Sequence, residues 1–213
     1  LYLAQATNRL APNGALIQGG DVTLIAGQDL QNAGTLRATN NLSAMAGNNI
    51  VNSGLIEAGN RLDLLASNNI VNKAGGIISG RDVSMVAIGG DVVSERTAST
   101  TGYSIKGYTQ TQDYVDSAAR IEAANDLSIS AGRDITSAGS VMYSGRDTTL
   151  TAGRDVNIVS AEQHRSEAGR GQSSGVSQYG SDLMVGRDVS VSAGRDISVI
   201  GSDIDAMRDI SMK

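Results

Sequence analysis

The single histidine of the chain, His164, stands between two carboxylates, Glu162 and Glu167. A histidine beside acids can ligate a metal ion, or it can act as a general acid and base. Here, however, the chain has no cysteine to complete a metal site, and the surrounding segment is rich in Gly, Ser and charged residues. We therefore expect a solvated segment at His164, with no catalytic residue, no metal and no cofactor.

The tripeptide Gly-Arg-Asp occurs six times, starting at Gly80, Gly132, Gly145, Gly153, Gly186 and Gly194. It differs from the Arg-Gly-Asp of integrin ligands. Glycine accepts a positive φ and aspartate hydrogen-bonds to nearby backbone, so the tripeptide predicts a repeated turn with a solvated arginine. Arg133 and Arg154 would stack on successive turns, and we expect the aspartate after each arginine to balance the charge. Calcium-binding β-rolls need Gly-Gly-x-Gly-x-Asp, which is absent.

Composition excludes several classes of protein. The chain has 213 residues with no Phe, no Trp, one Pro and 26 Gly, yet 40% of its residues are hydrophobic. A disordered chain would contain fewer apolar residues, so we expect a thin core of small and β-branched side chains. The net charge of −5 argues against nucleic acid as a partner. No apolar run approaches the ~18–20 residues of a membrane-spanning helix.

An internal repeat of 20 to 21 residues decides the fold class. One set of turn positions is spaced by 20, 20 and 21 residues, at Asp21, Asn41, Arg61 and Asp82. A second set is spaced by 20, 20 and 22, at Asp29, Asn49, Asn69 and Asp91. The pattern resumes at Asp126 and continues at Asp147, Asp188 and Asp209. Leu1 and Leu3 lie where a preceding copy would place them, so we expect residues 1–213 to form one segment of a longer array.

Each copy contains about three short runs in which apolar and polar residues alternate, as in Leu127-Ser128-Ile129. Alternation bounded by Gly, Asn and Asp indicates strands, and three strands per ~20 residues make one rung of a parallel β-helix. A leucine-rich repeat needs a different leucine frame. The sequence therefore predicts an all-β, right-handed parallel β-helix of about eight regular rungs, roughly 40 Å long. Inward positions should stack in ladders such as Leu24, Ala44, Leu64 and Met85, and amides should stack at Asn32, Asn52 and Asn72.

Two segments interrupt the repeat, at residues 94–117 and 162–182. The first contains Tyr103, Tyr108 and Tyr114 between Thr-rich flanks, and it is compatible with a hairpin lying against the helix. The second is richer in Gly, Ser and charge, which favours a flexible insertion. Insertions in a solenoid project from one face and often carry its function. The three tyrosines are therefore the candidate interaction surface.

The tandem units Ala152–Ile158 (AGRDVNI) and Ala193–Val199 (AGRDISV) resemble the hemagglutinin repeats of the filamentous hemagglutinin family. These are exoproteins of two-partner secretion, and they include adhesins and the toxin sticks of contact-dependent growth inhibition. The units after Asn125 are similar to the second, more C-terminal repeat region of the growth-inhibition proteins. The resemblance implies a secreted protein at the bacterial surface, an outer-membrane secretion transporter, and the neighbouring cell's surface or outer membrane as a partner. It brings no catalytic residues.

Two functions remain open. The segment is either a passive filament that presents an adhesin or a toxin, or an interaction module that binds a membrane, receptor or glycan through its insertions. β-Helices also serve polysaccharide-degrading enzymes, but these need convergent carboxylates in a groove, whereas here the aspartates recur alike in every turn. At both ends, from Leu1 to Leu10 and from Asp209 to Lys213, nothing looks like a polar cap. Uncapped rungs predict end-to-end association of the fragment.

Overall fold

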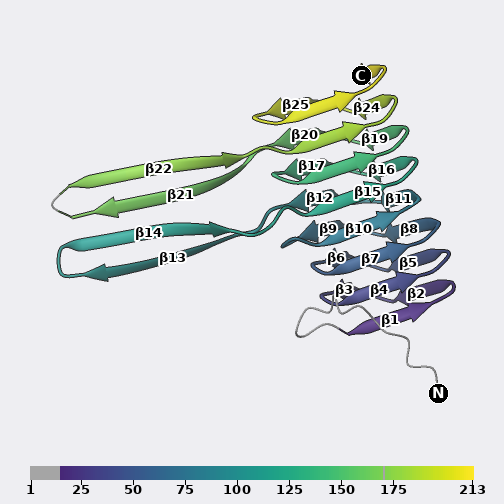
Figure 1. The fold of residues 1–213 in the computed structure, drawn as a ribbon, viewed down its shortest axis with the longest axis horizontal. Coiled ribbons are helices and arrows are strands. Elements are labelled where there is room, and N and C mark those ends of the chain that lie inside the picture. The colour runs from purple at the N-terminus through teal and green to yellow at the C-terminus, as the bar shows by residue number, and fades with distance from the viewer. Residues whose placement is uncertain (1–14, 170) are drawn as a thin grey trace.

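The computed structural model describes residues 15–169 and 171–213, and it is an all-β solenoid with a projecting arm (Figure 1). Three parallel sheets form the shaft, and a four-stranded antiparallel sheet forms the arm. The predicted fold class is confirmed. The expectations for Leu1, Leu3 and Leu10 fall outside the described residues.

Each rung of the shaft contributes one strand to each parallel sheet in turn, except the last, which has strands in the first two sheets only. The first sheet contains β1 (Leu16–Gly19), β4 (Thr35–Ala38), β7 (Leu55–Ala58), β10 (Ile77–Gly80), β15 (Arg120–Ala123), β18 (Val141–Ser144), β23 (Asp182–Val185) and β26 (Asp203–Ala206). The second contains β2 (Val22–Ala26), β5 (Leu42–Ala46), β8 (Arg61–Ala66), β11 (Asp82–Ala87), β16 (Leu127–Ala131), β19 (Thr148–Ala152), β24 (Val189–Ala193) and β27 (Ile210–Met212). The third contains β3 (Leu30–Asn32), β6 (Ile50–Asn52), β9 (Ile70–Lys73), β12 (Val92–Glu95), β17 (Ile135–Ala138), β20 (Val156–Val159) and β25 (Ile197–Ile200).

The core is a set of ladders that follow the strand alternation. In β16, Leu127, Ile129 and Ala131 are buried while Ser128 is exposed. Ile129 pairs in register with Met85 below it and Leu150 above it, both fully buried. The predicted ladder from Leu24 through Ala44 and Leu64 to Met85 is likewise confirmed by the pairing register. Each Leu, Ile, Val or Met side chain so buried contributes about 1.5–3 kcal/mol, so these residues stabilise a core that has no large rings.

The predicted asparagine ladder forms inside the third sheet. Asn32 Nδ2 donates to Asn52 Oδ1 at 2.8 Å, and Asn52 Nδ2 donates to Asn72 Oδ1 at 2.8 Å. Asn72 in turn donates to the backbone carbonyls of Gly76 and Arg120. These amides are buried, so the ladder satisfies polar groups that would otherwise be costly in the core.

Both insertions leave the shaft where a third-sheet strand turns toward the first sheet. The first insertion runs from residue 96 to 119, since Ser94 is still an inward residue of β12, paired with Asn72 and Ser137. The second runs from 160 to 181, since Asp182 already pairs with Val141 in the first sheet. After β17 and after β25 the same corner is a Gly-Ser pair, Gly139-Ser140 and Gly201-Ser202.

We predict that Ile129→Asp destabilises the shaft by more than about 4 kcal/mol, because an unpaired carboxylate would enter a dry core. The matched control is Ser128→Asp, one residue away on the exposed face, which should change the free energy of unfolding by less than about 0.5 kcal/mol. Urea denaturation followed by circular dichroism measures both. Equal midpoints for the two variants would mean that the inward and outward faces are reversed.

Candidate functional site

The candidate site is the arm, which is built from two hairpins that pair with each other (Figure 1). The first hairpin consists of β13 (Ala98–Ile105) and β14 (Tyr108–Val115), and the second of β21 (Ala161–Ala168) and β22 (Gln172–Tyr179). Strand β14 pairs antiparallel with β21, so the sheet order is β13-β14-β21-β22. The sequence was compatible with a hairpin lying against the helix in the first insertion, and it favoured a flexible second insertion. The structure has a hairpin in each insertion, and both hairpins stand away from the shaft (Figure 1).

The spacing of the two insertions explains why the hairpins meet. They leave the same corner of the shaft two rungs apart, after β12 and after β20. Rungs and paired strands share one spacing of about 4.8 Å, so two rungs span about 9.6 Å. A hairpin is also two strands wide. Two hairpins that leave the shaft two rungs apart therefore lie side by side, and this places β14 at hydrogen-bonding distance from β21. We call the segments that join each hairpin to the shaft its root.

Gly139 occupies the tight corner between the two roots. Its φ is +59°, a conformation that favours glycine. A Cβ at this position would lie 2.7 Å from Ala161 Cβ and 3.0 Å from Arg96 Cδ, so a larger residue would push the roots apart. Arg96 spans the same gap, with its guanidinium carbon 4.9 Å from the centroid of the Tyr179 ring and Nη1 donating to Asp116 O at 3.0 Å.

Polar contacts around Asp113 bind the two hairpins together. One carboxylate oxygen of Asp113 accepts a hydrogen bond from the Thr100 hydroxyl at 2.7 Å, and the other accepts one from the backbone N–H of His164 at 3.0 Å. These bonds lower the pKa of Asp113, with the Thr100 hydroxyl as the largest cause. Gln163 Nε2 also donates to Asp113 O at 2.7 Å.

The three tyrosines predicted as the interaction surface share one face of the arm. Tyr114 is opposite Ser99, Tyr103 opposite Gln110, and Tyr108 opposite Ile105. Residues directly opposite each other share a face, and these three pairs are separated by even numbers of residues, so all three tyrosines lie on the same side of the sheet. The rings of Tyr103 and Tyr108 are 5.8 Å apart. Tyr103 and Tyr114 are 51% and 54% exposed, so they contribute little to the core. We call this surface the tyrosine face.

A shallow hollow of about 190 Å³ lies beside Tyr103 and Tyr114. Its other lining residues are uncharged: Thr101, Gly102, Gln110 and Gln112. The nearest charges on β21, Arg165 and Glu167, pair with each other at 2.5 Å. Desolvation is the main cause that raises the pKa of Tyr108, and the Glu167 carboxylate adds to it.

The sequence reasoning did not single out Tyr179, which the register adds to the tyrosine face opposite Ala161. Its hydroxyl donates to Gln163 Oε1 at 2.8 Å. The only feature of the sequence that could have indicated this was the position of Tyr179, near the end of a second insertion about as long as the first. Nothing in the sequence indicated that the two insertions pair, and without that pairing the two sets of tyrosines have no common face.

The acid and base cluster around His164 does not form. His164 Nε2 lies 3.2 Å from Glu162 Oε2, and both side chains are about half exposed. Strand alternation places Glu167 on the opposite face of the arm. Within residues 15–169 and 171–213, no group of three or more His, Cys, Asp or Glu side chains could hold a metal ion. Over the same residues, no helix is long and apolar enough to span a membrane.

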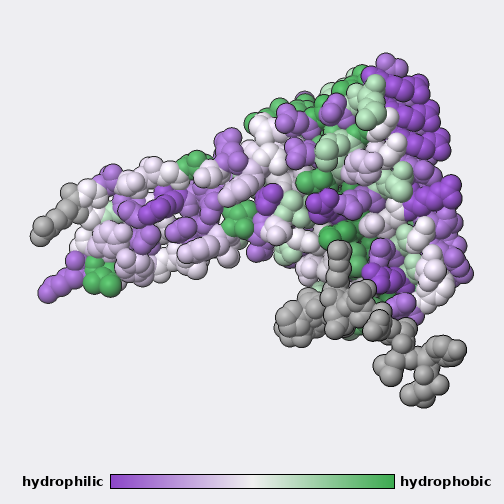
Figure 2. Space-filling view, in the orientation of Figure 1, coloured by the Kyte–Doolittle hydropathy of each residue, from purple (hydrophilic) through white to green (hydrophobic). Residues whose placement is uncertain are grey.

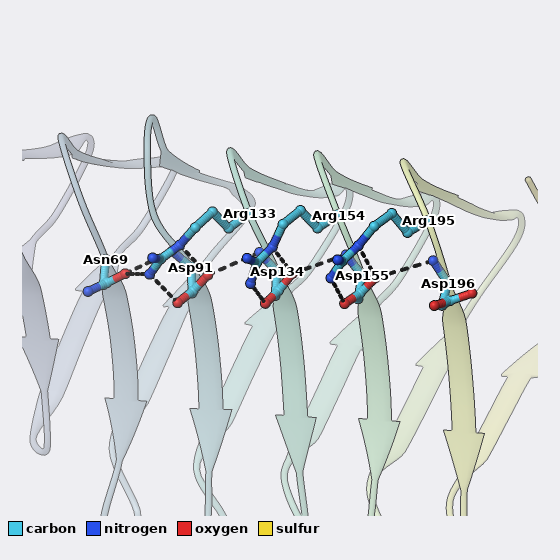
Figure 3. Close-up of polar contacts among 8 residues, drawn as sticks. All are labelled: Asn69, Asp91, Arg133, Asp134, Arg154, Asp155, Arg195 and Asp196. Atoms are coloured by element: carbon cyan, nitrogen blue, oxygen red, sulfur yellow. Dashed lines mark hydrogen bonds and ion pairs between the residues drawn. The ribbon is translucent and has the colours of Figure 1, made fainter.

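The Gly-Arg-Asp turns form ion-pair ladders along the corner between the second and third sheets (Figure 3). Arg133 pairs with Asp91 through contacts of 2.6 and 3.0 Å, and Arg195 pairs with Asp155 at 2.5 and 3.1 Å. Arg154 pairs in the same two-pronged way with Asp134. Each arginine is therefore balanced by the aspartate of the preceding rung, which corrects the expectation that the aspartate following it does this.

Backbone geometry explains this choice of partner. Asp134 Oδ1 accepts the backbone N–H of Asp155, one rung above, at 3.1 Å, so its carboxylate is turned along the axis of the shaft. Arg154 immediately precedes Asp155, and its guanidinium therefore lies over Asp134. This contact holds the pKa of the Asp134 carboxyl below its usual value. At the corner between the first and second sheets the pairs are looser, for example 3.5 Å between Arg187 and Asp147.

The geometry defines a class of protein, the parallel solenoids in which short repeats stack into a shaft. Residues 98–180 and 170–213 match the hemagglutinin repeat family. Because these matches cover more than half of the chain, the chain belongs to this family. Such repeats occur in secreted surface exoproteins of the filamentous hemagglutinin kind.

One curated relative is the 16S rRNA endonuclease CdiA of Enterobacter cloacae subsp. cloacae. It is 30% identical over 110 residues, which cover 48% of this chain. The aligned part is 3% of that protein's own length. No solved structure matches the chain.

We expect the ion pair at Asp134 to make the shaft depend on pH. Its folded-state pKa lies below the unfolded one, so its stabilising contribution is full above about pH 4 and is lost as the pH falls through the folded-state value. Asp134→Asn should cost up to about 1 kcal/mol at pH 7, since the amide keeps the backbone acceptor and loses the charge. In denaturation curves the difference between the two proteins should shrink as the pH falls below about 4, and it should vanish once the pH is below the folded-state pKa of Asp134.

The control is Asp196→Asn, at the top of this ladder, where no arginine among the described residues pairs with the carboxylate. If both substitutions have the same pH-dependent effect, the arginine contact is not the cause.

Gly139→Ala should separate the two hairpins while the shaft stays folded. The alanine would be strained at positive φ and would collide with both roots, at a cost of about 1–3 kcal/mol. Hydrogen exchange should show faster exchange in β14 and β21 and unchanged exchange in β16. Gly175→Ala, where an added Cβ has open space, is the control. Protected β14 and β21 amides in Gly139→Ala would contradict this side-by-side arrangement.

Proposed function

We propose that this chain is a non-enzymatic shaft segment of a large secreted bacterial exoprotein, and that its arm makes contact with neighbouring cells. The shaft would serve adhesion or the presentation of a toxin by length and stiffness. The observation that carries the proposal is the arm itself, which holds an exposed tyrosine face away from an otherwise uniform shaft (Figure 1).

Stiffness of the shaft follows from its bonding. Seven successive rungs are hydrogen-bonded to one another through three sheets, and side-chain ladders of Asn and of Arg with Asp run along the same axis. Bending would stretch the backbone bonds on one side of the shaft. A flexible linker does not require such bonding between rungs, whereas a filament that holds a distal domain away from the cell does.

The surface chemistry distinguishes the arm from the shaft (Figure 2). Hydrophilic residues gather along the shaft edge opposite the arm, where the Arg and Asp corners stack. Tyrosine combines a large rigid ring with a hydroxyl, and it is enriched where proteins bind one another. The tyrosine face therefore suits a receptor or glycan of the target cell. The net charge of −5 supports a partner other than nucleic acid.

The secretion route rests on the family. Exoproteins of this kind leave the cell through an outer-membrane transporter, and we propose such a partner for the producing cell. An enzymatic role finds no support, since Asp91, Asp134 and Asp155 recur at equivalent corners of the shaft and pair with arginines, rather than converging in a groove.

The test replaces residues 96–119 and residues 160–181, each by the Gly-Ser pair that forms the tight corner at Gly139 and Ser140. In the full-length exoprotein this should leave secretion and shaft folding intact. Attachment to target cells, measured by flow cytometry, should fall at least about tenfold because the binding face is removed.

A finer variant changes Tyr103, Tyr108 and Tyr114 to Ser and should show the same loss. Its control is Tyr143→Ser, an exposed tyrosine of the shaft. Undiminished attachment in the armless protein would show that the segment is only a spacer.

A further inference from the structure

The arm has two long edges, β13 and β22, with which no other strand of residues 15–169 and 171–213 pairs. Each is eight residues long, and neither contains a charged residue or a proline: Ala-Ser-Thr-Thr-Gly-Tyr-Ser-Ile and Gln-Ser-Ser-Gly-Val-Ser-Gln-Tyr. Every residue of β13 is exposed. In Figure 1 no strand lies beside the outer side of β13.

This distribution is the reverse of the usual one. Soluble proteins protect sheet edges with lysine, proline or bulges, because a bare edge pairs with other chains. In the arm the charges lie on the inner strands, with Asp113 on β14 and Glu162, Arg165 and Glu167 on β21. The two inner strands are thus the protected ones, and the two edges are not.

The two edges differ in their tendency to pair. Strand β13 contains Thr100, Thr101, Tyr103 and Ile105, which all favour β structure. Strand β22 consists mostly of Ser, Gln and Gly, and among its residues only Val176 and Tyr179 favour it. Strand addition at β13 is therefore better supported than at β22.

We propose that β13 pairs with β13 of a second copy of this chain, making one eight-stranded sheet from two arms. The arm already contains an interface of this type, since β14 and β21 come from separate insertions and pair along their edges. Pairing of the same strand from two copies is isologous and closes as a dimer, unlike pairing of β13 with β22, which would continue without limit.

The geometry sets the orientation of the partners. The strands of the arm stack along the shaft axis, so two β13 edges can face each other only when the two shafts run in opposite directions. With antiparallel β13 strands the twofold axis is normal to the sheet, and both tyrosine faces lie on the same side. The arms, each about 27 Å long from eight residues, would hold the two shafts apart.

The test uses the chain of residues 1–213 and measures mass against concentration by multi-angle light scattering. Unchanged protein should reach the mass of a dimer. Thr101 lies at the middle of β13, so a twofold axis brings it close to its counterpart. Thr101→Lys alone and Thr101→Glu alone should each weaken dimerisation at least about tenfold, because like charges would oppose each other across the new pair. An equimolar mixture of the two variants should restore the dimer.

Ser174→Lys, an exposed position within β22, is the control and should leave the dimer intact. Hydrogen exchange at β14 and β21 checks that the arm is folded in every variant. The proposal is overturned if the unchanged chain stays monomeric, or if Thr101→Lys associates as before, as it would through the shaft ends. It is also overturned if Ser174→Lys dissociates the dimer, or if the Lys and Glu variants are folded yet fail to pair.

Discussion

The structure depends on one constraint, the distance of about 4.8 Å at which parallel strands pair through their backbones. Once each rung is fixed at this distance, every side chain faces the same position in the rungs above and below. The sequence uses this in three ways. Buried aliphatic residues stack into a core without aromatic rings, and asparagine amides bond from rung to rung. At the corner between the second and third sheets, Arg133, Arg154 and Arg195 each lie over the Asp of the preceding rung.

The same distance accounts for the arm. Strands in the arm are separated by the same backbone bonds as rungs in the shaft, so two rungs and one hairpin have equal widths. Two insertions that leave one corner two rungs apart are thereby aligned for pairing. Insertions after consecutive rungs would overlap, and insertions three rungs apart would leave a gap of one strand. The arm is therefore a consequence of where the insertions lie as much as of what they contain.

The ion-pair ladder shows how a weak interaction becomes useful by repetition. An exposed pair contributes at most about 1 kcal/mol by itself. In this shaft the Asp carboxylate also accepts the backbone N–H of the next rung, as Asp91 does from Asp134 at 3.1 Å. The turn is thus bonded to its neighbour through both main chain and side chain. In an array of many rungs such bonds protect the corners, where the sheets themselves provide no pairing.

The sequence by itself determined the fold, since a period of 20 to 21 residues with alternating apolar positions is compatible with one arrangement of strands. It also determined the inward ladders and the asparagine ladder, because register in a solenoid follows directly from the period. Tertiary structure decided the partner of each arginine, since the direction of the Asp carboxylate depends on a backbone bond to the next rung. It also decided the tyrosine face. Tyr114 and Tyr179 lie on separate insertions, and only the pairing of β14 with β21, two rungs apart along the shaft, gives them a common surface.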